Sequence, residues 1–291
     1  MSATSNSVLG RRRRDVPAES PIHRAKCVSA RQRTTTVLLL STAAWAIVLL
    51  GAAPAVAASE IATRAKLLAA GAYADARALY RAAPTNSEIA WQFGRACFDW
   101  AEFATNNTQR AEIAEQGIAA CRRLIAREPK SAPGHYYLAM NLGQLARTKH
   151  LGALKIVDEM EREFKSTRDL DEHFDYAGPD RNLGLLYFEA PVIGSIGSRS
   201  KARQHLQRAV EVAPAYPENR LNLIEADLKW GDRNGARREL AALDAFGSVA
   251  RTNFAGDTWA ASWVDWEARL KKARWRTEEA ARPIVSPRNK S

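Results

Sequence analysis

Hydrophobic residues recur at helical spacing through most of the chain, and the helical stretches come in pairs that end at prolines. The clearest pair begins at Leu183-Gly184-Leu185-Leu186-Tyr187 and ends at Pro214. Small residues let two antiparallel helices approach, larger apolar residues fill the seam between them, and proline ends the second helix because it cannot continue one. The small residues are Gly184, Ala202 and Ala209, and the larger ones are Leu183, Tyr187 and Leu206. One such pair cannot bury its apolar face alone, so the pattern predicts a stack of helical hairpins.

The same order of residue types follows again at Leu223, Ala236, Leu240 and Leu243. Leucine-glycine-x2-tyrosine, then alanine-x3-phenylalanine, then proline is typical of the tetratricopeptide repeat (TPR), which this stretch resembles. The resemblance implies an all-α, right-handed stack of TPR-like hairpins, a helical solenoid whose repeats bind other proteins.

Three more hairpins are expected upstream. A shortened repeat runs from Ile61 to Pro84 as helix, turn at Gly71 and helix. A second pairs a helix that opens at Trp91 with a helix over 108–127, and a third begins at Tyr136. Two segments interrupt the pattern and contain turn-forming residues. They are an acidic, solvated insertion over 169–179 and a loop over 190–198.

The repeat pattern ends after Phe246, and an aromatic helix follows. Trp259, Trp263 and Trp266 fall on one helical face, with Leu270 next on the same side. A solenoid needs its open end covered, so this face predicts a C-terminal capping helix; the alternative is a functional aromatic cage. We expect the TPR-like helical domain to span 58–275 and a flexible tail to span 276–291.

The N-terminal segment reads as an export signal. A basic stretch (1–35) precedes an uncharged apolar stretch (36–50), and Ala55-Val56-Ala57 offers small residues for cleavage near 57/58. The expectation is a cleaved signal peptide over 1–57 and an exported protein, periplasmic or otherwise extracytoplasmic. The alternative is an uncleaved segment that anchors the protein in the membrane. Membrane contact is expected only through such an uncleaved signal.

The charge and the absent motifs argue against several classes of function. The formal net charge is +11, and residues 1–57 contribute +6 of it. Acidic and basic residues are interleaved in the remainder, which does not favour nucleic-acid binding. The sequence contains no HExxH, CxxC, GxSxG or phosphate-binding glycine loop. We therefore expect a non-enzymatic protein with no cofactor and no metal.

Two sets of polar residues are candidate sites. Asp169, Asp171, His173 and Asp175 could hold a divalent cation, but without a consistent loop spacing they are better read as a solvated acidic insertion. His205 is expected to be a partly exposed helix residue, because no nucleophile lies near it in the sequence.

Cys97 and Cys121 occupy facing positions of one predicted hairpin. Cys97 takes the tyrosine position counted from Gly94, and Cys121 takes the phenylalanine position counted back from Pro129. In an oxidising compartment the two could form a disulfide. The alternative is two buried small hydrophobic residues that pack together.

A TPR stack offers a concave face lined by its first helices. In each repeat the lining positions are two residues before the motif leucine and two, five and six after it. Applied here, they are Trp91, Arg95, Phe98, Asp99, Tyr136, Met140, Gln144, Arg181, Leu185, Phe188, Glu189, Leu221, Glu225, Leu228 and Lys229. Aromatic and charged side chains of this kind suit a peptide or helix of a partner. The alternative is that the C-terminal helix or the insertions fill this groove.

Arg181 allows the most specific prediction for a residue of that face. It follows the Gly178-Pro179 turn and has no partner at helical spacing, since Glu189 is two turns away. Either Arg181 engages an acidic group of a partner, or the acidic insertion upstream holds it in a structural role. The second alternative is favoured because the insertion lies immediately before it.

The stretch from Gly178 to Pro191, with Gly194, Gly197 and the helix 201–214, also resembles exported bacterial TPR-like proteins. These include the T-components that accompany TRAP-transporter solute-binding proteins, which are all-helical and bind a partner protein. The resemblance implies a scaffold or adaptor for another envelope protein, such as a solute-binding or transport component. It also implies an alternative, an accessory component in which the 190–198 loop and Phe188 line a pocket for a small apolar ligand.

Overall fold

The computed structural model describes residues 52–149 and 153–279, with side chains from Ala58 to Glu278. Over these residues the chain forms ten helices and no strand. The helices are α1 (Ala52–Ala82), α2 (Ser87–Ala101), α3 (Asn107–Arg127), α4 (Ala132–Ala146), α5 (Ala153–Leu170), α6 (Phe174–Glu189), α7 (Arg199–Val212), α8 (Pro217–Trp230), α9 (Arg233–Asn253) and α10 (Asp257–Glu279). The predicted all-α fold is confirmed.

Consecutive helices pack as hairpins, as the small-residue pattern predicts. The pairs are α2 with α3, α4 with α5, α6 with α7 and α8 with α9. Gly184 shows why a small residue is needed, because a Cβ there would lie 2.7 Å from Cγ of Leu206 on the facing helix. Buried Leu183, Tyr187 and Leu206 fill the seams of this region.

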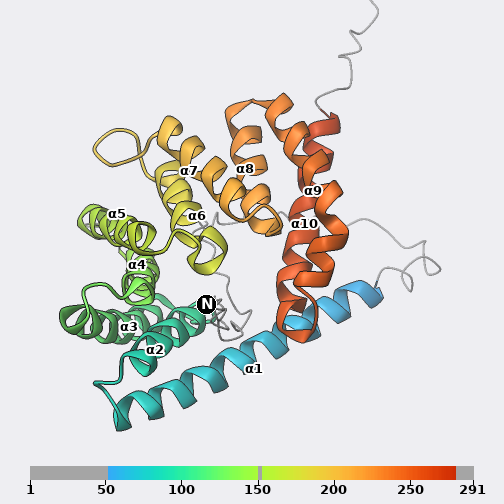
Figure 1. Cartoon of the computed structure of the whole chain (residues 1–291). Coiled ribbons are helices and arrows are strands. Elements are labelled where there is room, and N and C mark those ends of the chain that lie inside the picture. The colour runs from blue at the N-terminus through green and yellow to red at the C-terminus, as the bar shows by residue number, and fades with distance from the viewer. Residues whose placement is uncertain (1–51, 150–152, 280–291) are drawn as a thin grey trace, which may run out of the picture.

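The hairpins form an arc, and the two terminal helices meet across its open side. Figure 1 shows α2 to α9 in chain order around the arc, with α10 returning beside α8 and α9. Helix α1 runs along the open side from α2 to α10, and it contacts both.

The predicted turn at Gly71 is wrong, because α1 is one continuous helix with Gly71 inside it. Glycine costs a helix interior about 1 kcal/mol relative to alanine but does not break it. The neighbouring residues, mostly alanine, leucine and arginine, are strong helix formers, and they keep the helix intact.

The predicted acidic insertion is much shorter than expected. Helix α5 continues to Leu170, and α6 begins at Phe174. Asp175, Tyr176 and Ala177 then take a left-handed conformation, with φ of 51°, 54° and 64°. Asp175 and Ala177 are buried, so this part of the insertion is not a solvated loop.

The 190–198 segment is a loop, as predicted, and Val192 and Ile193 are exposed at its tip. Helix α10 covers the end of the stack. Trp266 is 1% exposed and meets the ring of Tyr216 edge-on at 5.6 Å, so its face is packed as core rather than open as a cage.

The predicted boundaries fall partly outside the described residues. The apolar stretch 36–50 lies outside them, and the expected cleavage point near 57/58 lies within α1. Helix α10 continues to Glu279, so the start of the predicted flexible tail is helical. Within the described ranges no helix has both the length and the apolar character needed to cross a membrane.

Candidate functional site

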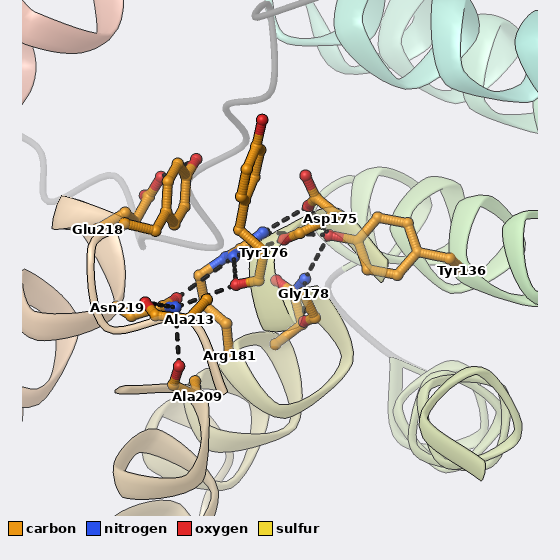
Figure 2. A network of polar contacts seen from close by, with 11 residues as sticks. Tyr136, Asp175, Tyr176, Gly178, Arg181, Ala209, Ala213, Glu218 and Asn219 are labelled. Carbon is orange, nitrogen blue, oxygen red and sulfur yellow. Dashed lines mark hydrogen bonds and ion pairs between the residues drawn. The ribbon is translucent and has the colours of Figure 1, made fainter. Parts of the chain in front are cut away.

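Arg181 is the centre of a buried polar network that joins several repeats (Figure 2). Its Nη2 donates to Oδ2 of Asp175 at 2.5 Å. Its Nη1 donates to the carbonyl oxygens of Asp175 at 3.0 Å and Tyr176 at 3.1 Å. We call this network the Arg181 joint.

The left-handed turn explains why two carbonyls point at one guanidinium. Three consecutive residues other than glycine in this region are costly, roughly 1–2 kcal/mol each. The contacts that hold the turn include a hydrogen bond from the Tyr136 hydroxyl to the Asp175 carboxylate. At Gly178 a Cβ would lie 2.7 Å from that same hydroxyl oxygen, so glycine lets α4 approach.

The joint extends to α8 through Asn219. Arg181 Nη1 donates to Oδ1 of Asn219 at 3.3 Å, and Asn219 Nδ2 donates to the carbonyls of Tyr176 at 3.0 Å and Ala209 at 2.9 Å. The guanidinium also lies 5.1 Å from the ring centre of Tyr216. Groups of α4, α6 and α8 therefore contact one cation, and Asn219 links it to α7.

Arg181 is fully charged in this setting. Burial by itself would lower the pKa of Arg181, but the Asp175 carboxylate beside it outweighs that effect and the pKa lies above its ordinary value. Of the two predicted roles, the structure favours the structural one, with Asp175 of the insertion as the partner.

The remaining acidic residues of the insertion do not gather into a metal site. Asp169 pairs with Arg168 at 3.1 Å, and Asp171 accepts the backbone N–H of His173 at 3.0 Å. The described part of the chain holds no group of three metal-ligating side chains. His205 is not partly exposed as predicted; it is buried, with Nδ1 at 2.6 Å from Oδ1 of Asp180.

Much of the predicted concave face is buried rather than open. Besides Arg181, the buried members are Phe98, Asp99, Tyr136, Gln144 and Leu221. Gln144 donates to the carboxylate of Glu102, and with Phe98 and Met140 it lines a small cavity of about 20 Å³. Trp91 of α2 stacks on Tyr137 of α4 with ring centres 5.8 Å apart.

Three predicted residues do form an exposed group at the ends of α6 and α8. Lys229 Nζ lies 4.2 Å from the ring centre of Phe188 and 3.7 Å from the Glu189 carboxylate. Glu189 and Lys229 are exposed, and Phe188 is half-buried. We call Phe188, Glu189 and Lys229 the 188–229 patch.

Helix α10 fills the groove beside Glu225, through a residue that the sequence analysis missed. Arg269 Nε donates to the Glu225 carboxylate at 2.7 Å, and Nη2 donates to Oδ1 of Asn222 at 2.5 Å. The sequence predicts the packing of the tryptophan face of this helix. It does not predict the contacts of Arg269, because nothing in the sequence pattern links this residue to Glu225 or Asn222.

The two terminal helices meet at a seam formed by α1, the end of α2 and the start of α10. Arg64 of α1 pairs with Asp257 of α10 at 2.6 Å, and both side chains are mostly exposed. The seam encloses a pocket of about 430 Å³ whose walls are mainly apolar. Buried Asp99 lines this pocket, and its Oδ2 lies 3.7 Å from Nε of Arg95. Burial raises the pKa of Asp99 to about 7, with Arg95 opposing the rise and Asp175 and Glu102 adding to it.

Cys97 and Cys121 are both buried and free, so of the two alternatives the structure contains the core pair rather than the disulfide. Burial raises the pKa of Cys97 well above its ordinary value and that of Cys121 to about 12, which keeps both thiols protonated and unreactive. Cys121 also fills the space above Gly94, where a Cβ would lie 2.4 Å from its sulfur.

Comparisons with known proteins agree with this architecture. The family model of regulator of microtubule dynamics protein 1-3 matches residues 59–161, less than half of the chain. No curated protein sequence matches.

Among solved structures, the chain is similar to TTC0263, a thermophilic TPR protein of Thermus thermophilus. The TM-score is 0.50 at 17% identity, over 73% of this chain and 98% of that chain. Identity this low shows the fold and not the activity. The predicted TPR architecture is thus confirmed: the chain has a TPR-like helical-repeat fold.

Proposed function

We propose that the chain is an exported, non-enzymatic helical-repeat scaffold that binds a partner protein. The observation that carries the proposal is the 188–229 patch, in which a half-buried aromatic ring lies beside two exposed charged side chains from two neighbouring repeats. Repeat proteins build their binding surfaces from such neighbouring repeats. An aromatic ring beside paired charges can supply both an anchor and charge-assisted hydrogen bonds.

The partner test compares one charge reversal on the patch with one on an outer hairpin. Lys229→Glu and Phe188→Ala are expected to weaken capture of the same envelope protein about tenfold or more. Arg122→Glu, at an exposed pair with Glu159, is the control and should leave capture unchanged. Equal capture by all three variants would contradict the proposal.

Export is part of the proposal and rests on the N-terminal order of basic, apolar and small residues. The partner is then an envelope protein, with a solute-binding or transport component as the leading class. The mass of the mature protein from its native host tests this, with an expected N-terminus at Ala58. A full-length chain retained in the membrane would instead support the anchor.

A second candidate function is the binding of a small apolar molecule. The observation in its favour is the seam pocket, whose apolar lining includes Ile61, Leu68 and Phe103. In the alternative given above, the 190–198 loop and Phe188 line such a pocket; the apolar tip of this loop is exposed. Native mass spectrometry of the purified protein would show a retained small molecule if this candidate is correct.

A further inference from the structure

The seam pocket combines apolar walls with an unusual density of carboxylates. The apolar lining comes from α1, the end of α2 and α10, namely Ile61, Ala65, Leu68, Phe103, Ala260 and Ala261. The charged lining consists of the carboxylates Asp99, Glu102, Asp257 and Asp265 and one cation, Arg64. Negative charge therefore gathers here on a chain whose formal net charge is +11.

Each of the four carboxylates has a cation beside it, and for Asp99 this is Arg95 at 3.7 Å. Asp257 pairs with Arg64, Glu102 pairs with Arg147 at 2.8 Å, and Asp265 lies 3.7 Å from Arg269. The partners of Glu102 and Asp265 do not line the pocket. A ligand in the pocket would thus meet more carboxylate than guanidinium.

Asp99 is the most deeply buried of the four carboxylates. Its side chain is 9% exposed, and its distance of 3.7 Å to Arg95 is long for a charge-assisted hydrogen bond. Its Oδ1 is buried and has no hydrogen-bond partner among the described residues. A buried carboxylate oxygen without a donor is costly, and an ammonium or guanidinium that enters beside Asp99 would stabilise the charge of its carboxylate.

We propose that the seam pocket binds a lysine or arginine side chain of a partner protein, carried on a short apolar segment. The inference rests on the proposed scaffold function and names the chemistry of the partner. The cation reaches Asp99, while the apolar residues beside it pack on the walls from α1 and α10. The exposed Arg64–Asp257 pair lies at the rim, where Arg64 can exchange its carboxylate for solvent as the segment enters.

The experiment measures fluorescence anisotropy of two labelled peptides with the full chain. One has the sequence Gly-Ala-Leu-Lys-Leu-Ala-Gly, and the other has glutamine in place of lysine. The lysine peptide should bind at least about tenfold more tightly, because only it brings a charge to Asp99. Equal binding of the two peptides, or no binding of either, would overturn the inference.

Matched variants locate the site. Asp99→Asn and Asp257→Asn each remove one carboxylate of the pocket, and each should weaken the lysine peptide, Asp99→Asn by about tenfold or more. Glu159→Gln removes the same charge outside the pocket and should change nothing. Because Asp257 is exposed, its variant folds even if Asp99→Asn does not. Unchanged binding in both pocket variants would contradict the assignment.

One further variant decides between occupants. In it, the eight Arg and Lys residues of the N-terminal basic stretch are replaced by glutamine. If the lysine peptide binds this variant but not the unchanged chain, the pocket belongs to the protein's own basic segment and the partner assignment is wrong.

The two proposals fail separately. Loss of partner capture in Lys229→Glu together with no peptide binding would remove the pocket and keep the scaffold. Peptide binding that depends on Asp99, with partner capture unaffected by any patch variant, would keep the pocket and refute the 188–229 patch.

Discussion

The Arg181 joint and the α1–α10 seam each use an arginine–aspartate pair at nearly the same distance, 2.5 Å and 2.6 Å. At the joint the two side chains are 7% and 2% exposed, whereas at the seam they are 63% and 68% exposed. Water screens the second pair and holds its side chains loosely, so its net contribution is small. Water cannot solvate the buried Arg181 and Asp175 side chains if their pair is broken. The same contact therefore locks one region and leaves the other able to open.

The largest expected effect is that of Arg181→Ala. It leaves the Asp175 carboxylate buried without its cation and leaves two carbonyls without their donor, which should cost about 3–5 kcal/mol of unfolding free energy. Denaturant unfolding followed by circular dichroism measures it. A loss under about 1 kcal/mol would show that the joint is not what holds the repeats together.

The pH dependence of unfolding in the Asp99→Asn variant tests the electrostatics of the α1–α10 seam. The pKa of Asp99 is about 7 in the folded chain and near 3.8 when unfolded, so the folded state holds the extra proton between these values. Stability should therefore fall as pH rises from about 4 to about 7, by roughly 1–3 kcal/mol from this group. The asparagine variant should lose that fall and be the more stable protein at pH 8. A melting temperature with the same pH profile as the wild type would contradict the assignment.

Gly71→Ala sharpens the description of α1 as a single bridging helix. No atom lies within 4 Å of a Cβ at this position, so alanine should stabilise the helix by about 0.5–1 kcal/mol. Had the expected turn been present, alanine would have been neutral or destabilising. Thermal unfolding of the two proteins decides between these outcomes.

Ala177→Gly addresses the strain stored in the joint. Ala177 has φ of 64°, where glycine has no steric penalty, so the variant should gain about 0.5 kcal/mol after its entropic cost. Ala209→Gly is the control, because Ala209 is buried within α7 and glycine there should cost about 1 kcal/mol. Equal destabilisation by both would mean that the turn is not strained.

The smallest expected effect is that of Arg64→Ala at the seam. An exposed ion pair contributes about 0.2–1 kcal/mol, and salt reduces it further. The loss should shrink in high salt, whereas the loss caused by Arg181→Ala should persist because water and ions do not reach that pair. If the loss of stability in Arg64→Ala did not change with salt, the Arg64–Asp257 pair would behave as a buried contact.

The concave face shows where sequence reasoning stopped. The repeat offsets identified Tyr136 and Arg181, and the structure brings them together, with Arg181 Nη2 3.4 Å from the Tyr136 hydroxyl. The offsets could not show that a left-handed turn would cover both residues, because that turn depends on contacts with Tyr136 and Asn219. Nor could they show that Arg269 would fill the groove beside Glu225.

The four hairpins from α2 to α9 follow from the sequence alone, because each depends on small and large residues that meet within one repeat, as Gly184 and Leu206 do. The sequence also determined the capping helix, since three tryptophans share one face and need a covered surface. How the arc is joined and closed depends on tertiary contacts between residues far apart in the sequence. Arg64 and Asp257 are 193 positions apart, and no periodicity in the sequence links residues at such a separation. Burial made Arg181 a structural cation, and it left one oxygen of the Asp99 carboxylate without a hydrogen-bond donor.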